Sequence, residues 1–233
     1  MSRSLDISIF AALALVWGLT FPAIAVGLEY IPPLLFAAFR YDVAAVLLLA
    51  YAVLATDVWT PTGRNNQLAI VGSGTFLIAG NGLLFIGQQT VPSGVAAIMQ
   101  ALIPIATAAW ALVLLEERLS VAGIIGVVVG FLGISLVVQP DPANLLGGDT
   151  LGRLIIVMQV ISIALGSVIV QRAAPSLNRV PLLGWSMLLG ALLLHGLSLG
   201  VGEIPESSIT SPPAVGSILY LGVGQEYDDL DAA

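Results

Sequence analysis

The chain has 233 residues, of which 58% are hydrophobic and 9% are charged. With a mean hydropathy of +1.03, it cannot cover itself with polar surface as a soluble globule does, so the bilayer must be its solvent. The net charge of −7 argues against nucleic acid as a partner. Cysteine is absent and His195 is the one histidine, so we expect no metal site and no cofactor.

Apolar stretches separated by polar or Pro/Gly breaks predict seven membrane-spanning helices. Prolines explain several breaks, such as Pro32-Pro33 between the first two spans and Pro92 between the third and fourth. An eighth apolar stretch after Pro213 ends near Gly224 and would cover only about 18 Å of a roughly 30 Å hydrocarbon core. The predicted spans are 7–28, 33–55, 67–90, 93–115, 120–138, 151–173 and 181–201.

Arginine placement predicts the orientation of the chain. Basic residues favour the cytoplasmic side of short loops. With a cytoplasmic N-terminus, Arg153 is the one loop arginine on the outer side, whereas the inner side holds Arg3, Arg64, Arg118, Arg172 and Arg179. We therefore expect a multi-pass protein of the cell membrane with its N-terminus in the cytoplasm.

The first two spans contain residues that fit a transport pathway. Trp17 and Phe21 lie one turn apart on one face, and Pro22 removes a backbone hydrogen bond. Arg40 is the costliest residue in any span and should face protein or water, either as an anchor for an anionic substrate or in a structural pair. Asp42 is two positions further on, hence on a nearly opposite face, so it cannot simply neutralise Arg40.

Amide side chains predict a polar seam along the third and fourth spans. Asn81 and Gln88 lie two turns apart on one face, and Gln100 and Pro104 share a face of the next span. Pro104 has no N–H and leaves the carbonyl of Gln100 free as an acceptor. A substrate pathway and amide bonds between helices both explain such a seam. The predicted pathway residues are Trp17, Phe21, Arg40, Asn81, Gln88, Gln100 and Pro104.

Two further features are interpreted as structural. Glycines recur along one face of the fifth span, which predicts close helix packing at Gly123, Gly126, Gly130 and Gly133. His195 is expected to be a hydrogen-bonded residue of the bundle, since no carboxylate lies near it in the sequence. The sequence contains no His-Glu-x-x-His and no Gly-x-Ser-x-Gly motif, so we expect no enzyme.

The chain also carries a sign of an internal repeat. The segment around Gly18 is similar to that around Gly166, and Pro33 and Pro181, which each open the next span, have the same separation. A five-span unit and its copy have opposite orientations, as in many secondary transporters. Copies of the fourth and fifth spans would begin beyond Ala233, so we expect an incomplete second repeat that results from truncation or a frameshift.

These motifs together resemble the first repeat of EamA-type transporters in the drug/metabolite transporter superfamily: Trp17-Gly18, Phe21-Pro22, Pro33, Arg40, Gly87-Gln88, Pro104 and Glu116-Glu117. The resemblance implies an all-α membrane bundle of two inverted five-helix repeats around a central cavity. It also implies export or exchange of small metabolites such as amino acids. The expected domains are a first repeat at 1–138, a partial second repeat at 150–225 and an acidic tail at 226–233.

The expected partners are the lipid bilayer and a small-molecule substrate, and a homodimer is left open. Two other interpretations stay open as well. A truncated, non-transporting membrane protein or interaction subunit would need no water path through the bundle. A membrane-embedded enzyme would need a polar catalytic cluster at one interface.

Overall fold

The computed structural model describes residues 3–115, 121–138, 148–204 and 207–223, and within these ranges it is helical and contains no strand. Five of its helical segments are long and apolar enough to cross a membrane: Pro33–Ala55, Arg64–Gly87, Ser93–Leu114, Asp149–Ala173 and Arg179–Gly200. The predicted class of an all-α membrane protein is therefore confirmed. The acidic tail expected at 226–233 lies outside the described residues.

The helices follow the predicted spans closely. Differences at most ends are a few residues, which is the usual uncertainty of helix ends. The elements are α1 (Arg3–Leu28), α2 (Pro33–Ala55), α3 (Arg64–Gly72), η1 (Ser73–Ile78), η2 (Ala79–Asn81), α4 (Gly82–Gly87), α5 (Ser93–Gln100), α6 (Ile103–Leu114), α7 (Val121–Val138), α8 (Gly148–Ala173), α9 (Arg179–Gly200), η3 (Ser207–Thr210) and α10 (Pro212–Val223).

Two of the predicted spans depart from regular α-helix at one place each, which we call the helix interruptions, although each stays one apolar segment long enough to cross a membrane. Between α3 and α4 the chain forms a π-helical segment, η1, and then a 3-10 turn, η2. Between α5 and α6 the helix breaks at Ala101 and Leu102. Pro104 explains the second break, because it cannot donate to the carbonyl four residues earlier. The first lies in a glycine-rich stretch, where helix propensity is low.

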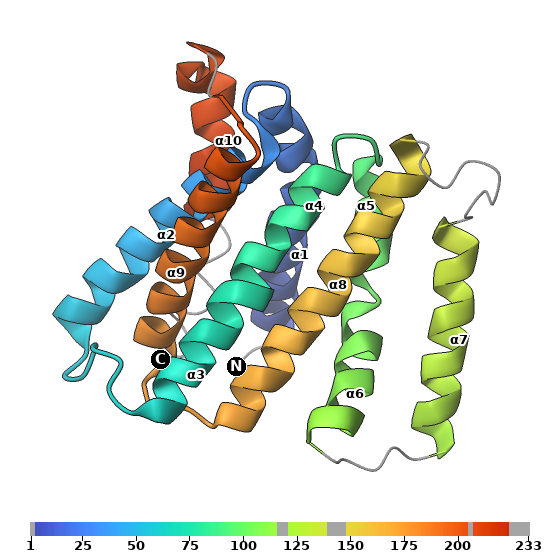
Figure 1. Ribbon diagram of the computed structural model, residues 1–233, viewed down its shortest axis with the longest axis horizontal. Helices are drawn as coiled ribbons and strands as arrows, with labels where there is room; N and C mark the ends of the chain where they lie inside the picture. The colour runs from blue at the N-terminus through green and yellow to red at the C-terminus, as the bar shows by residue number, and fades with distance from the viewer. Residues whose placement is uncertain (1–2, 116–120, 139–147, 205–206, 224–233) are drawn as a thin grey trace.

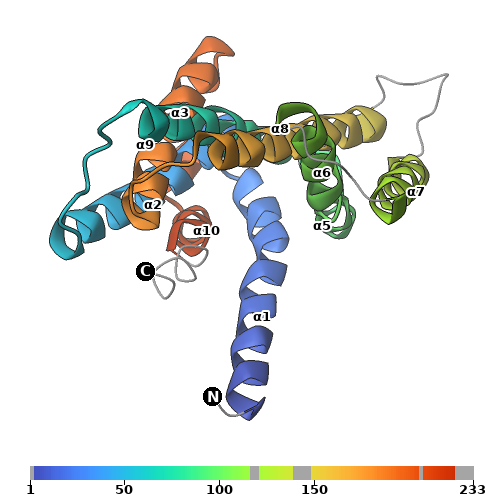
Figure 2. The same ribbon diagram turned by 90° about the horizontal axis from the view of Figure 1, so that it is seen from below.

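The α2 and α9 helices make the most extensive helix–helix contact and lie at one side of the bundle, with α6 and α7 at the other side (Figure 1). The segment from α3 to α4 packs against α8 and α9, while α10 packs against α1 and α2. Close approach is possible at Gly190 of α9, where a Cβ atom would lie 2.9 Å from the carbonyl oxygen of Gly74. The α1 helix crosses the others steeply and projects away from them toward its N-terminus (Figure 2).

One side chain holds each end of the α2–α9 pair by hydrogen bonds to backbone N–H groups. Both carboxylate oxygens of Glu203, which follows α9, accept hydrogen bonds from the first turn of α2, at Leu34 N (3.1 Å) and Leu35 N (2.9 Å). At the opposite end, Oδ1 of Asn66 accepts from the backbone N–H groups of Ser176 (2.9 Å) and Leu177 (3.1 Å), just before α9. These contacts satisfy backbone donors that helices cannot satisfy themselves at their starts or in turns.

Candidate functional site

Four polar side chains from four elements form a hydrogen-bonded cluster inside the bundle. We call Tyr41, Asn81, Gln100 and Gln159 the amide cluster. Asn81 donates to the hydroxyl of Tyr41 at 2.7 Å and accepts from Gln159 at 3.1 Å. Gln100 and Gln159 exchange two bonds, of 3.0 and 3.2 Å. Gln159 is fully buried, whereas Asn81 and Gln100 are half-buried, and the amides of the cluster bond to one another.

The cluster lies at the two helix interruptions. Asn81 is the last residue of the 3-10 turn η2, and Gln100 is the last residue of α5 before the break. Irregular backbone at membrane depth is tolerated where it is buried in protein or lines a cavity, and broken helices form many transporter binding sites. The two predicted amides Asn81 and Gln100 are thus brought together, and Gln159 of α8 is the residue that joins them.

Arg40 lies beside this cluster. Its side chain is 4% exposed, and its guanidinium carbon lies 4.4 Å from the ring centre of Tyr41 and 5.9 Å from that of Phe85. A guanidinium over aromatic faces gains cation–π attraction, which is stronger where water is excluded. The sequence-based expectation that Arg40 turns toward protein is confirmed by this burial.

Gln88 and Phe21 meet at a second polar contact. Nε2 of Gln88 donates to the backbone carbonyl of Phe21 at 3.2 Å, and the hydroxyl of Ser93 donates to the same carbonyl at 3.2 Å. Among the described residues, the buried Oε1 atom of Gln88 has no hydrogen-bond partner. This contact ties α1 to the loop between α4 and α5 just before Pro22.

The structure does not bring Trp17 and Pro104 into either cluster. Trp17 is 57% exposed on the projecting part of α1, and Pro104 is exposed on α6. Of the glycines predicted to pack, Gly130 lies against Ile105, where a Cβ would clash, whereas a Cβ at Gly126 or Gly133 would meet nothing within 4 Å. The role of the whole set as pathway and packing residues stays a prediction.

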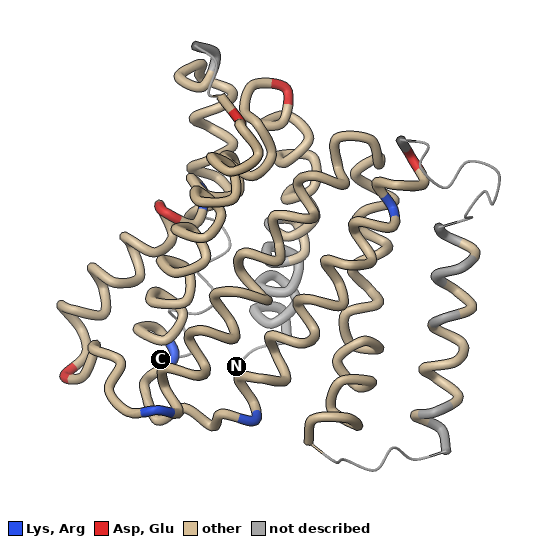
Figure 3. The backbone as a smooth tube through the Cα atoms, viewed as in Figure 1, with Lys and Arg blue, Asp and Glu red and all other residues tan. Residues whose placement is uncertain are grey.

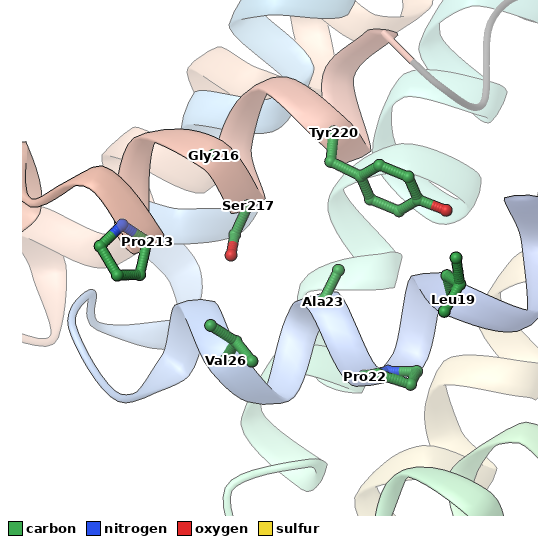
Figure 4. Close-up of a pocket in the computed structure, with 8 residues that line it drawn as sticks. All are labelled: Leu19, Pro22, Ala23, Val26, Pro213, Gly216, Ser217 and Tyr220. Carbon is green, nitrogen blue, oxygen red and sulfur yellow. The ribbon is translucent and has the colours of Figure 1, made fainter.

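A cavity of about 340 Å³ lies elsewhere, in the groove between α1 and α10 (Figure 4). Its walls are mainly apolar, and Ser217 and Tyr220 bring the polar atoms. None of the predicted pathway residues lines it. The lining residues are Leu19, Pro22, Ala23, Val26, Pro213, Gly216, Ser217 and Tyr220.

Sequence reasoning missed two groups of polar residues. Gln159 and Tyr41 complete the amide cluster, and an amide within an otherwise apolar sixth span was the signal that could have identified Gln159. His195 is hydrogen-bonded within the bundle as expected, but its partner is Asp42, whose Oδ2 lies 2.7 Å from Nε2. Distance in the sequence gave no hint of a carboxylate that a neighbouring antiparallel helix supplies.

Apolar helices around a polar cluster define a polytopic helical membrane protein. The model of the EamA-like transporter family matches residues 5–139. The chain belongs to this family, which confirms the resemblance drawn from its motifs. Because the family consists of transporters, the expectation that the chain is no enzyme is also confirmed.

Curated relatives agree with this assignment. The chain is 30% identical to the uncharacterized inner membrane transporter YedA of Escherichia coli K12, over 91% of the chain and 66% of YedA. It is 24% identical to an uncharacterized transporter of Archaeoglobus fulgidus, over 89% of the chain and 71% of that protein. It therefore spans about two thirds of the length of these relatives. No solved structure matches the chain significantly.

Proposed function

We propose that the chain moves small polar or carboxylate-bearing metabolites across the cell membrane, with the amide cluster and Arg40 as the binding residues. The observation that carries the proposal is the fully buried Gln159 bonded to both Asn81 and Gln100 at helix interruptions. Polar groups at this depth are costly unless they pair or serve a substrate. Amino acids fit such a site, because they combine a carboxylate with polar groups.

Arg40 and the amides have different roles in this proposal. The guanidinium beside Tyr41 attracts the substrate carboxylate and can bind it through two parallel hydrogen bonds. The amides of Gln100 and Gln159 exchange their mutual bonds for bonds to the substrate, which fixes its orientation. Since the cluster already satisfies these amides, substrate entry replaces hydrogen bonds rather than creating them, and selectivity follows from how well it replaces them.

Two inverted repeats, the first at 1–138 and the second beginning near 150, form the framework of the proposed transporter. The packing pattern supports this arrangement. In this arrangement α8, α9 and α10 are the copies of the first, second and third spans. The third span packs against α8, just as its copy α10 packs against α1. The second span, α2, packs against its own copy, α9. The hydrogen bonds at the two ends of the pair follow the same relation. Glu203, which follows α9, binds the start of α2, and Asn66, which follows α2, binds the chain just before α9.

The N-terminus is cytoplasmic in this proposal. Arg64 and Arg179 begin α3 and α9, and Arg172 ends α8. These three helix ends share one edge of the bundle, where basic residues gather (Figure 3). Under the positive-inside rule this edge faces the cytoplasm.

Ligand-dependent thermal stability tests the function. A metabolite that binds the folded chain stabilises it by an amount that grows with the logarithm of 1 + [L]/Kd, where [L] is the free ligand concentration, and so raises its Tm. We expect one or more carboxylate-bearing metabolites from a panel of amino acids and organic acids to raise the Tm of the purified chain. Arg40→Gln should abolish that increase while the Tm without ligand falls by a few degrees at most.

The matched control is Arg153→Gln, because Arg153 pairs with Asp149 at the start of α8, away from the cluster. This variant should keep the ligand effect. Gln100→Leu should weaken it, since leucine keeps bulk but removes a donor and an acceptor. If Arg40→Gln and Gln100→Leu lose folded protein in proportion to ligand response, the cluster only joins helices and the non-transporting alternative is favoured.

A further inference from the structure

Asp42 and His195 form a contact between two ionisable side chains in the middle of membrane-spanning helices. His195 Nε2 lies 2.7 Å from Asp42 Oδ2. At 1.5 Å per residue, Asp42 is roughly 13 Å along α2 from Pro33, and His195 is about 8 Å before the end of α9 at Gly200. Both positions lie within hydrocarbon depth, where ionisable residues are rare and usually functional.

Helix packing alone does not require this pair. The α2 and α9 helices already pack closely, for example where Gly184 leaves room for Leu48 and Leu49. Two amides or hydroxyls would join the helices at lower cost, because they need not be taken out of water as ions. The pair also differs in accessibility from the fully buried Gln159 of the amide cluster, since the side chains of His195 and Asp42 are 30% and 37% exposed.

The surroundings leave Asp42 as the charged group that acts on His195. The ring of Phe39 packs edge-on against the imidazole at 5.5 Å. Other titratable groups on the packed helices have other contacts. Arg40 is stacked over Tyr41, Glu203 binds the start of α2 and Ser198, one turn after His195, and Tyr220 lines the groove beside α1. Arg64 and Arg179 begin α3 and α9, at the opposite end of α9 from His195.

We propose that Asp42 and His195 form a proton-binding site that takes up one proton and releases it in each transport cycle. The coupling to transport rests on the proposed function, whereas the proton-binding site does not. With Asp42 ionised and His195 neutral, Nε2–H donates to Oδ2 and the pair has a net charge of −1. A proton from water then adds to the lone pair of Nδ1, the pair becomes neutral overall, and release to water on the other side reverses the step.

The net charge connects the proton to helix movement. A neutral pair is compatible with a packed α2–α9 contact in a low-dielectric environment, whereas a net charge favours an arrangement that admits water. Since α2 and α9 come from different proposed repeats, protonation of the Asp42–His195 pair changes how strongly the two repeats are held together. Hard cations such as Na⁺ prefer oxygen ligands, so an imidazole–carboxylate pair points to a proton.

The single histidine makes the site directly observable. We would label the chain with ¹⁵N-histidine, reconstitute it in lipid nanodiscs and follow the imidazole nitrogens by NMR from pH 5 to 9. The ring nitrogens report whether His195 gains a proton in this range, and Asp42→Asn should change their response to pH, because it removes the carboxylate that contacts Nε2. Asp149→Asn, the same change at the start of α8, should leave that response unchanged.

Either a ring that gains no proton between pH 5 and 9 or a pH response that is unaffected by Asp42→Asn overturns the site. Asp42→Glu, which keeps the charge but moves the carboxylate, serves if the asparagine variant does not fold, and it should also change the pH response of the ring. Proteoliposomes that contain a pH-sensitive dye then test coupling with a mixture of common amino acids. Substrate movement without proton movement overturns coupling alone. Absence of substrate movement, with a titrating His195, overturns transport and coupling together.

Discussion

The two ends of the α2–α9 pair are fastened with the same geometry but with different chemistry. Glu203 supplies a carboxylate to two N–H groups in the first turn of α2. Asn66 supplies a neutral amide oxygen to two N–H groups in the turn before α9. A helix start carries partial positive charge and favours an anion, whereas a turn offers no such macrodipole. The charged side chain thus lies at the helix start, where the donors carry partial positive charge, and the neutral one lies at the turn.

Every backbone N–H group in the first turn of α2 has a hydrogen-bond partner. Pro33 at the first position has no N–H, Leu34 and Leu35 donate to Glu203, and Phe36 donates to the carbonyl of Pro32 at 2.8 Å. All donors that the first turn cannot satisfy internally therefore have partners. Glu203 also accepts a hydrogen bond from the buried hydroxyl of Ser198 at 2.7 Å. Removal of the Glu203 side chain therefore leaves three donors without this acceptor.

The largest expected effect is that of Glu203→Ala. We expect a loss of about 2 to 4 kcal/mol in the free energy of unfolding, because charge-assisted bonds are lost and buried donors remain. SDS-induced equilibrium unfolding in mixed micelles measures it. Glu203→Gln, which keeps one acceptor oxygen, should lose clearly less. Equal losses in both variants would mean that the charge is irrelevant at this helix start.

Asn66→Ala should have a smaller effect, about 1 to 2 kcal/mol, because the lost bonds are neutral. The same unfolding assay applies. Asn66→Asp keeps an acceptor for Ser176 and Leu177 but loses the donation to the Thr62 carbonyl, so it should retain part of the stability. A loss larger than that of Glu203→Ala would reverse the proposed ranking of the two ends.

The end that Asn66 fastens has a second contact, which sharpens the comparison. Trp59 and Trp185 stack with ring centres 6.2 Å apart, and Nε1 of Trp185 donates to the carbonyl of Trp59 at 2.9 Å. Trp185→Phe keeps an aromatic ring and removes the donor, so we expect a loss of about 1 kcal/mol. An unchanged unfolding curve would show that the stacking alone holds this loop.

The smallest expected effect is the coupling between the ends. Distant sites add within about 0.5 kcal/mol, so the Glu203→Ala and Asn66→Ala losses should sum in the double variant. This double-mutant cycle uses the same micelle assay. A larger coupling would mean that the α2–α9 pair transmits strain from one end to the other, as a rigid unit would.

Much of the fold could be predicted because its causes are local. Prolines mark several helix starts, such as those of α2 and α5, and apolar length identifies spans without knowledge of neighbours. The buried position of Arg40 followed from the cost of a charge in hydrocarbon. The π-helical segment at Ser73–Ile78 was not predicted, because no proline marks it and its contacts lie on α8 and α9.

The site could be predicted only in part because its bonds join distant segments. Asn81 and Gln100 were identified as a seam, yet their connection through Gln159 depends on where α8 packs. From the sequence, Asp42 was considered as a possible partner of the nearby Arg40, whereas its partner is His195 on the antiparallel helix α9. Glu203 was not identified, since nothing in its own sequence indicates the start of α2 as its target.

The Glu203 contact also constrains the order in which the chain can be completed during synthesis. Leu34 and Leu35 lie 169 and 168 residues before their acceptor. At translation rates of 5 to 20 residues per second, on the order of 10 to 30 seconds pass between the emergence of the donors and that of the carboxylate. During this time the first turn of α2 must be hydrated or bound by the insertion machinery. The first turn of α2 is therefore among the last parts of this pair to complete its hydrogen bonds, although it is among the first to be made.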